Sequence, residues 1–107
     1  MSILVIGTRA PDEYAALERE LAGEHEVVVV PDAARGRMML GNPDWALVVL
    51  DDGEFVRRDV LDAARDVPVV AVLARPTLEA TLNALEAGVR DVQAPPLRAD
   101  RLRDLAA

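Results

Sequence analysis

The sequence predicts a doubly wound α/β fold: a three-layer α/β/α sandwich around a (βα)5 parallel sheet with strand order 2-1-3-4-5. Two observations carry this prediction. Five runs typical of β-strands alternate along the chain with five segments of helical periodicity. Such alternation is typical of a parallel sheet with right-handed crossovers and helices on both faces. In addition, four of the five strand runs are continuously apolar, as expected for strands that are buried on both faces.

The expected strands are short and rich in Val, Leu and Ile, except for the last, which is weak. They are Ser2–Ile6, Val27–Val30, Ala46–Leu50, Val69–Leu73 and Asp91–Gln93. A half-exposed strand would alternate apolar and polar residues, and the first four runs do not. The sequence therefore predicts that both faces of these four strands are covered by helices.

Capping and turn residues mark the first two helices. The first helix starts at Pro11, which suits an initial helical turn, and stops before Gly23. Its apolar side chains recur at Tyr14, Leu17 and Leu21. Asp32 is expected to cap a second, short helix over Ala33–Leu40.

The last three helices follow the later strands. The third ends before Pro68, and its apolar positions are Val56, Val60, Leu61 and Ala64. Thr77 is expected to cap the fourth helix and Gly88 to end it. Its apolar stripe consists of Leu78, Leu82, Leu85 and Val89. The fifth helix is indicated by Leu97, Leu102 and Leu105.

Length and composition limit the classes of protein. The 107 residues form a single domain over residues 1–107, and because its last helix is short we expect it to be the N-terminal part of a longer protein. A formal charge of −7 argues against nucleic acid and anionic membranes as partners. There is no cysteine, no signal peptide and no apolar run long enough to span a bilayer, so a cytoplasmic location is expected.

A ligand site in such a sheet is expected at the carboxyl ends of strands one and three, where the strand order reverses. The residues there are Gly7, Thr8 and Arg9 after the first strand, and Asp51, Asp52 and Gly53 after the third. For the first loop, a phosphate cradle is one interpretation, but the glycine-rich phosphate motifs are absent, which favours a plain loop.

Three segments resemble the CheY-like receiver domains of response regulators, and the match covers nearly the whole chain. LVVLDDG resembles the third receiver strand, which ends at the phospho-acceptor Asp; VPVVAVLA resembles the fourth strand; ALEAGVRDVQAPP resembles the region from the fourth helix to the Lys-Pro pair. GVRDV followed by Pro is also similar to the receiver-like N-terminal domain of tight-adherence (Flp) pilus assembly ATPases. The resemblance implies a flavodoxin/receiver-like fold.

Carried over residue by residue, the receiver motif is incomplete in this chain. Asp51 falls on the acceptor position, whereas Gly7 and Thr8 fall on the acidic pair that holds magnesium. Leu73 falls on the switch Ser/Thr, and Pro95 falls on the lysine. The chain contains no lysine at all, because all 12 of its cationic residues are arginine.

These losses remove the charges that phosphoryl transfer requires. Catalysis of that reaction depends on positioning and on neutralising charge, and magnesium needs carboxylate ligands. Losing one positioned electrostatic donor commonly lowers the rate by about 10²–10³. We therefore expect a phosphorylation-independent pseudo-receiver that is not an enzyme, with no catalytic residue, metal or cofactor.

Asp51 and Asp52 allow two interpretations at this site. They are either the remains of a cation or phosphoryl site, or a turn and N-terminal cap before the third helix, since Asp-Asp-Gly is common in turns. The second interpretation is favoured.

The resemblance also implies a partner surface, because receivers commonly associate through their fourth helix, fifth strand and fifth helix. In this chain the apolar residues of that region are Leu82, Leu85, Val89, Val92, Leu97, Leu102 and Leu105. Some must face the sheet, and the remainder would form an exposed patch. The expected partner is another protein or a second copy of the chain. The expected role of this chain is in pilus assembly or polar localisation.

Two alternatives stay open. The chain could be a degenerate receiver that is still phosphorylated on Asp51 in two-component signalling. A cofactor-binding module of the same fold is the other, but a flavin site needs a Ser/Thr-rich loop where only Thr8 is present, and a cobalamin motif needs a histidine that His25 does not supply.

Overall fold

The computed structural model describes residues 2–7, 11–42, 44–53 and 58–106. Within them the chain alternates strands and helices throughout. The strands are β1 (Ser2–Gly7), β2 (Glu26–Val30), β3 (Trp45–Gly53), β4 (Val69–Leu73) and β5 (Asp91–Gln93). The helices are α1 (Pro11–Leu21), α2 (Ala33–Met39), α3 (Arg58–Ala64), α4 (Leu78–Ala87) and α5 (Ala99–Ala106).

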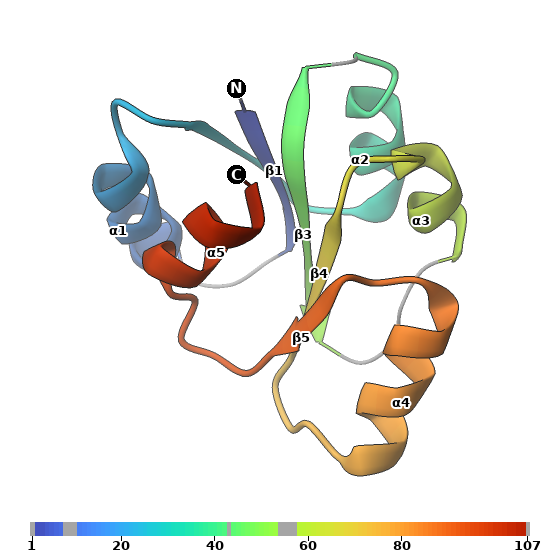
Figure 1. The fold of residues 1–107 in the computed structure, drawn as a ribbon. Coiled ribbons are helices and arrows are strands. Elements are labelled where there is room, and N and C mark those ends of the chain that lie inside the picture. The colour runs from blue at the N-terminus through green and yellow to red at the C-terminus, as the bar shows by residue number, and fades with distance from the viewer. Residues whose placement is uncertain (1, 8–10, 43, 54–57, 107) are drawn as a thin grey trace.

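The five strands form one parallel sheet in the order β2-β1-β3-β4-β5, as the sequence predicts. Figure 1 shows α1 and α5 on one face of this sheet and α2, α3 and α4 on the other. The chain is therefore a three-layer α/β/α sandwich. None of the helices in the described part is both long and apolar enough to cross a membrane.

Successive side chains of a strand point to opposite faces, so each strand contributes to two cores. Ile3 and Val5 of β1 and Leu47 and Val49 of β3 pack against α1 and α5. The intervening residues of the same strands pack on the other face, against α2, α3 and α4. This alternation fixes which face each later residue of β1 and β3 reaches.

The predicted helix ends are confirmed at α2 and α4. The Asp32 carboxylate accepts a hydrogen bond from the backbone N–H of Arg35 (2.8 Å), and the Thr77 hydroxyl accepts one from that of Ala80 (3.0 Å). Gly88 ends α4 with a φ of 117°, in the left-handed region that glycine adopts without a steric penalty. Local capping chemistry therefore sets the length of both helices.

β3 extends three residues beyond the apolar run that predicts it. Its pairing with β4 joins Leu50 to Ala71 and Gly53 to Leu73, so three steps along β3 match two along β4. One extra residue is thus accommodated on β3, as in a β-bulge. Asp51, Asp52 and Gly53 consequently lie in the strand.

Candidate functional site

The candidate site lies where the carboxyl ends of β1 and β3 meet. Gly7 and Asp51 are partners in the register between these strands, and both are buried. Only 5% of Asp51 is exposed. A buried carboxylate requires a polar partner, since an isolated charge inside a protein is costly.

Tyr14 on α1 provides a partner for that carboxylate. Its hydroxyl donates a buried hydrogen bond to Oδ2 of Asp51, at 3.0 Å. The alternation of β3 explains the pairing: Leu47 and Val49 face α1 and α5, so Asp51, two residues further, faces α1 as well. Helical periodicity alone assigns Tyr14 to the core. Continuing the odd-numbered positions of β3 by one step, from Val49 to Asp51, also places the carboxylate on the face that Tyr14 covers.

Gly7 leaves the space in which this pair forms. A Cβ atom at residue 7 would lie 2.5 Å from the Tyr14 hydroxyl oxygen and 2.5 Å from the carbonyl oxygen of Asp51. Both distances are shorter than van der Waals contact, so any larger residue at this position would displace its neighbours. Glycine at residue 7 and tyrosine at residue 14 are therefore sterically coupled.

The other predicted positions of the cleft are only partly described. Leu73 is buried at the end of β4, with 5% of its surface exposed, and Pro95 is half-buried after β5. The backbone of Asp52 belongs to β3, but its side chain and residues 8–10 lie outside the described part of the chain. Among the side chains that are described, no three Asp, Glu, His or Cys residues are grouped to hold a metal ion.

The favoured interpretation of Asp51 and Asp52 as a turn and helix cap is wrong. Both residues lie in β3, and α3 begins only at Arg58. The one-residue bulge extends the strand through Gly53, which pairs with Leu73 of β4. The pairing between strands thus overrides the turn preference of Asp-Asp-Gly.

The predicted interaction face divides into exposed and buried residues. Leu82 and Leu85 on α4 are 48% and 44% exposed, and Leu78, one turn earlier, is 76% exposed. These three residues follow one another at i, i+4 and i+7, so they lie along one side of the helix. We refer to Leu78, Leu82 and Leu85 as the α4 leucine stripe.

The other members of that face pack within the domain. Val89 and Leu102 are buried, with 5% and 0% of their surface exposed, because they pack in the cores on opposite faces of the sheet. Val89 and Leu102 therefore do not belong to an exposed interaction face. Val92, Leu97 and Leu105 are half-buried against the same two cores.

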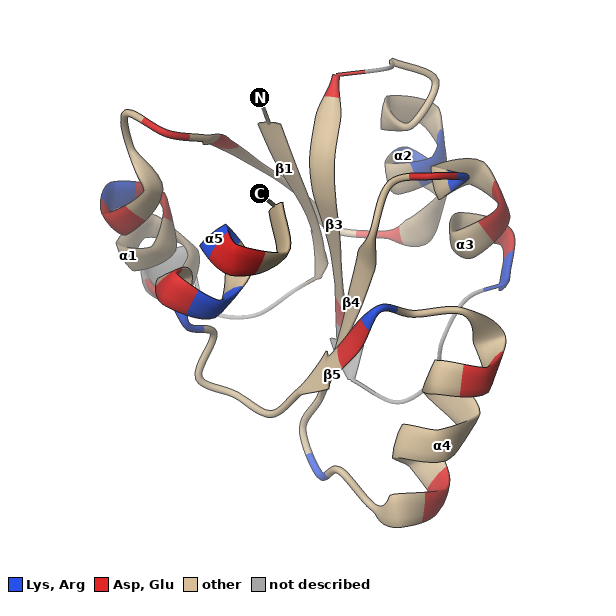
Figure 2. Cartoon of the chain, viewed as in Figure 1, with Lys and Arg blue, Asp and Glu red and all other residues tan. Residues whose placement is uncertain are grey.

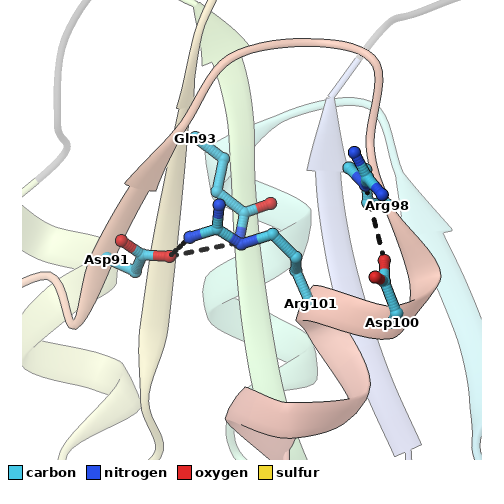
Figure 3. Close-up of polar contacts among 5 residues, drawn as sticks. All are labelled: Asp91, Gln93, Arg98, Asp100 and Arg101. Carbon is cyan, nitrogen blue, oxygen red and sulfur yellow. Dashed lines mark hydrogen bonds and ion pairs between the residues drawn. The ribbon is translucent and has the colours of Figure 1, made fainter.

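On the opposite side of the sheet from α4, β5 and α5 carry polar groups that bond to one another (Figure 3). The Asp91 carboxylate accepts hydrogen bonds at Oδ2 from Nη2 of Arg101 (3.1 Å) and from Nε2 of Gln93 (3.2 Å). Arg98 and Asp100 form a second pair at 3.5 Å, exposed to solvent. In Figure 2 charged residues crowd α1 and α5, whereas α4 carries only acidic ones, Glu79 and Glu86.

No protein-family model matches the chain, and no curated protein sequence does. Solved structures do match it. HP1043, an orphan response regulator of H. pylori, superposes with a TM-score of 0.84 at 19% identity, over 100% of this chain and 97% of that chain. The receiver domain of the sensor histidine kinase PA1611 from Pseudomonas aeruginosa PAO1, crystallised with magnesium in its active-site cleft, gives a TM-score of 0.75 at 21% identity, over 98% and 93%.

A third similar structure carries a different description. It is a candidate pilus assembly-related protein of Burkholderia pseudomallei K96243, with a TM-score of 0.70 and 21% identity over 99% of this chain and 89% of that one. Likeness at this level of identity is informative about architecture. The chain has the fold of the receiver domains of response regulators.

Proposed function

We propose that the chain is a phosphorylation-independent pseudo-receiver that acts as a protein-interaction or dimerisation module. The observation that carries this proposal is the state of Asp51, the residue on the acceptor position. It is 5% exposed and accepts a hydrogen bond from Tyr14. A phosphodonor has to reach this carboxylate in line, so burial opposes the reaction before any question of catalysis arises.

The surroundings of Asp51 support the same conclusion. The receiver of PA1611 holds magnesium in its cleft. In this chain, the position of one magnesium-binding acid is Gly7, the switch position is the apolar Leu73, and the lysine position is Pro95. Losing one positioned electrostatic donor commonly lowers an enzymatic rate by about 10²–10³, so the joint loss of these groups leaves little activity.

The α4 leucine stripe supports association as the activity that remains. Leu78, Leu82 and Leu85 expose apolar surface at adjacent positions of one helix, and contiguous apolar surface on a domain usually marks a binding site. The polar groups of β5 and α5, by contrast, already have partners within the domain, since Asp91 is bonded by both Arg101 and Gln93. A partner therefore gains most from covering the leucines.

Similar structures suggest a setting for such a module. HP1043 is described as an orphan response regulator, and the Burkholderia pseudomallei protein is a candidate pilus assembly-related protein. We place this domain in the same kind of setting, as an interaction module of pilus assembly or polar localisation.

Intact mass measurement tests the loss of phosphorylation. The chain is incubated with magnesium and acetyl phosphate, beside a receiver that retains the acids and the lysine as a positive control. No mass gain is expected in this chain, because Asp51 is buried and the neutralising groups are missing. A gain of one phosphoryl group that Asp51→Asn abolishes would favour the alternative, a phosphorylatable receiver.

Sedimentation over a range of concentrations tests association through the stripe. We expect the chain to self-associate and Leu82→Arg to abolish the association. An unpaired charge buried at the contact would weaken the free energy of association by on the order of several kcal/mol. Met38→Arg is the matched control: Met38 lies on α2 on the same side of the sheet and is 80% exposed, but it is outside the stripe. A monomer at all concentrations, or an equal effect of the two substitutions, would contradict self-association through α4.

A further inference from the structure

Three residues at the cleft form a unit that the incomplete receiver motif does not explain. Gly7 and Asp51 are register partners at the ends of adjacent strands. Side chains two residues apart on a strand point to the same face, and Val5 and Val49 pack against α1. Gly7 and Asp51, each two residues further along, therefore also face α1. Tyr14, on α1, is 5% exposed and places its hydroxyl 3.0 Å from Asp51.

We propose that Tyr14 is a built-in closure of the cleft, in which its hydroxyl takes the role of a bound cation at Asp51. The inference rests on the proposed function and gives it a physical cause. A carboxylate in a buried cleft has to be compensated, and here a permanent O–H donor of the chain compensates it. The closed state then needs no ion.

Gly7 is the residue that makes the closure possible. A Cβ at this position would approach the Tyr14 hydroxyl oxygen to 2.5 Å. An acidic side chain at residue 7 would therefore compete with the phenol for the same space, and would also set a second negative charge beside Asp51. Glycine at residue 7 and tyrosine at residue 14 are thus two parts of one arrangement.

The closure also attaches α1 to the sheet. The hydrogen bond joins residues 37 positions apart, on α1 and on β3. Because the acceptor is a carboxylate, the bond belongs to the stronger, charge-assisted class. This bond therefore ties α1 to β3, as expected of a domain that does not switch.

A double-mutant cycle tests this closure. Unfolding by urea is followed through the fluorescence of Trp45, the only tryptophan, in the natural chain, Tyr14→Phe, Asp51→Ala and the double variant. Tyr14→Phe should raise the unfolding equilibrium constant about 10-fold to 100-fold when Asp51 is present, as for loss of a buried hydrogen bond to a charged group, and by much less when it is absent. Equal effects in both backgrounds would overturn the proposal.

The control and the fallback use the same readout. Ser2→Ala also removes a hydroxyl group from a partly buried residue, but at the opposite end of β1, so it should not couple to Asp51→Ala. If Asp51→Ala does not fold, Asp51→Asn replaces it: this side chain keeps a neutral acceptor, and the effect of Tyr14→Phe should fall but not vanish. An undiminished effect would again contradict the closure.

The two proposals fail in different ways. A phosphoryl mass gain on Asp51 in the natural chain contradicts the proposed function and is independent of the cycle. Additive effects of Tyr14→Phe and Asp51→Ala, with no mass gain, contradict the closure alone. The proposal of a pseudo-receiver would then stand without this physical cause.

Discussion

Gly7 shows how far a single residue decides the geometry of the cleft. It is buried at the end of β1, beside the Asp51 backbone and the Tyr14 hydroxyl. The sequence predicts that Gly7 and Asp51 lie at neighbouring strand ends, and this is confirmed by their register. The contact with Tyr14 could not be read from strand runs alone, since it depends on where α1 docks along the sheet.

Gly7→Ala is expected to destabilise the domain. The added Cβ would lie 2.5 Å from both the Tyr14 hydroxyl oxygen and the Asp51 carbonyl oxygen, and relief requires a backbone shift. Overpacking of this kind costs about 1–3 kcal/mol in free energy of unfolding. Urea unfolding measures it.

Gly41→Ala is the matched control, because a Cβ there would meet only the Met38 carbonyl oxygen, at 3.3 Å. A Gly7→Ala variant as stable as Gly41→Ala would show that the cleft can expand and that glycine is not required there.

At the scale of elements, the predicted bounds of β4 and β5 are confirmed, and the largest error lies at the end of β3. Thr77 and Gly88 bound α4 through local chemistry that is visible in the sequence, and both assignments are confirmed. The end of β3 depends instead on the pairing of Gly53 with Leu73, which lies on another strand. Turn propensity therefore misassigned Asp51 and Asp52, because a non-local ladder governs them.

Thr77→Ala tests how much the cap contributes to α4. Loss of the bond from the Ala80 N–H is expected to lower the free energy of unfolding by about 1 kcal/mol. Thr81→Ala serves as control, since Thr81 lies inside α4, where alanine is the better helix former. Thermal unfolding of both variants is the measurement. A loss of equal size in Thr81→Ala would mean that capping is not the cause.

At the scale of the whole molecule, the layer architecture followed from the alternation of strand and helix runs. The order 2-1-3-4-5 is confirmed, and two cores form on the two faces of the sheet. The sequence did not show which leucines of α4 and α5 are exposed and which are buried. Leu82 and Leu102 have similar helical patterns around them, but Leu102 is fully buried and Leu82 is half exposed. The rotation of each helix about its axis, set by docking, distinguishes them.

That distinction changes how the association surface has to be approached. Leu102 packs in the core against α1 and the sheet, so a charge there would disrupt the fold rather than report on a partner. The α4 leucine stripe is accessible without such damage. Substitutions in the stripe on α4 are therefore expected to leave the Tyr14–Asp51 contact at the strand ends unchanged.

Arg103 on α5 links the last helix to the C-terminal end of the first helix. Its guanidinium group contacts the Glu24 carboxylate at 2.6 Å and the backbone carbonyl oxygen of Glu20 at 3.1 Å, bridging 79 and 83 positions of sequence. Because α5 and α1 also pack in one core, loosening of the last helix would remove packing contacts from the first helix without an intervening strand.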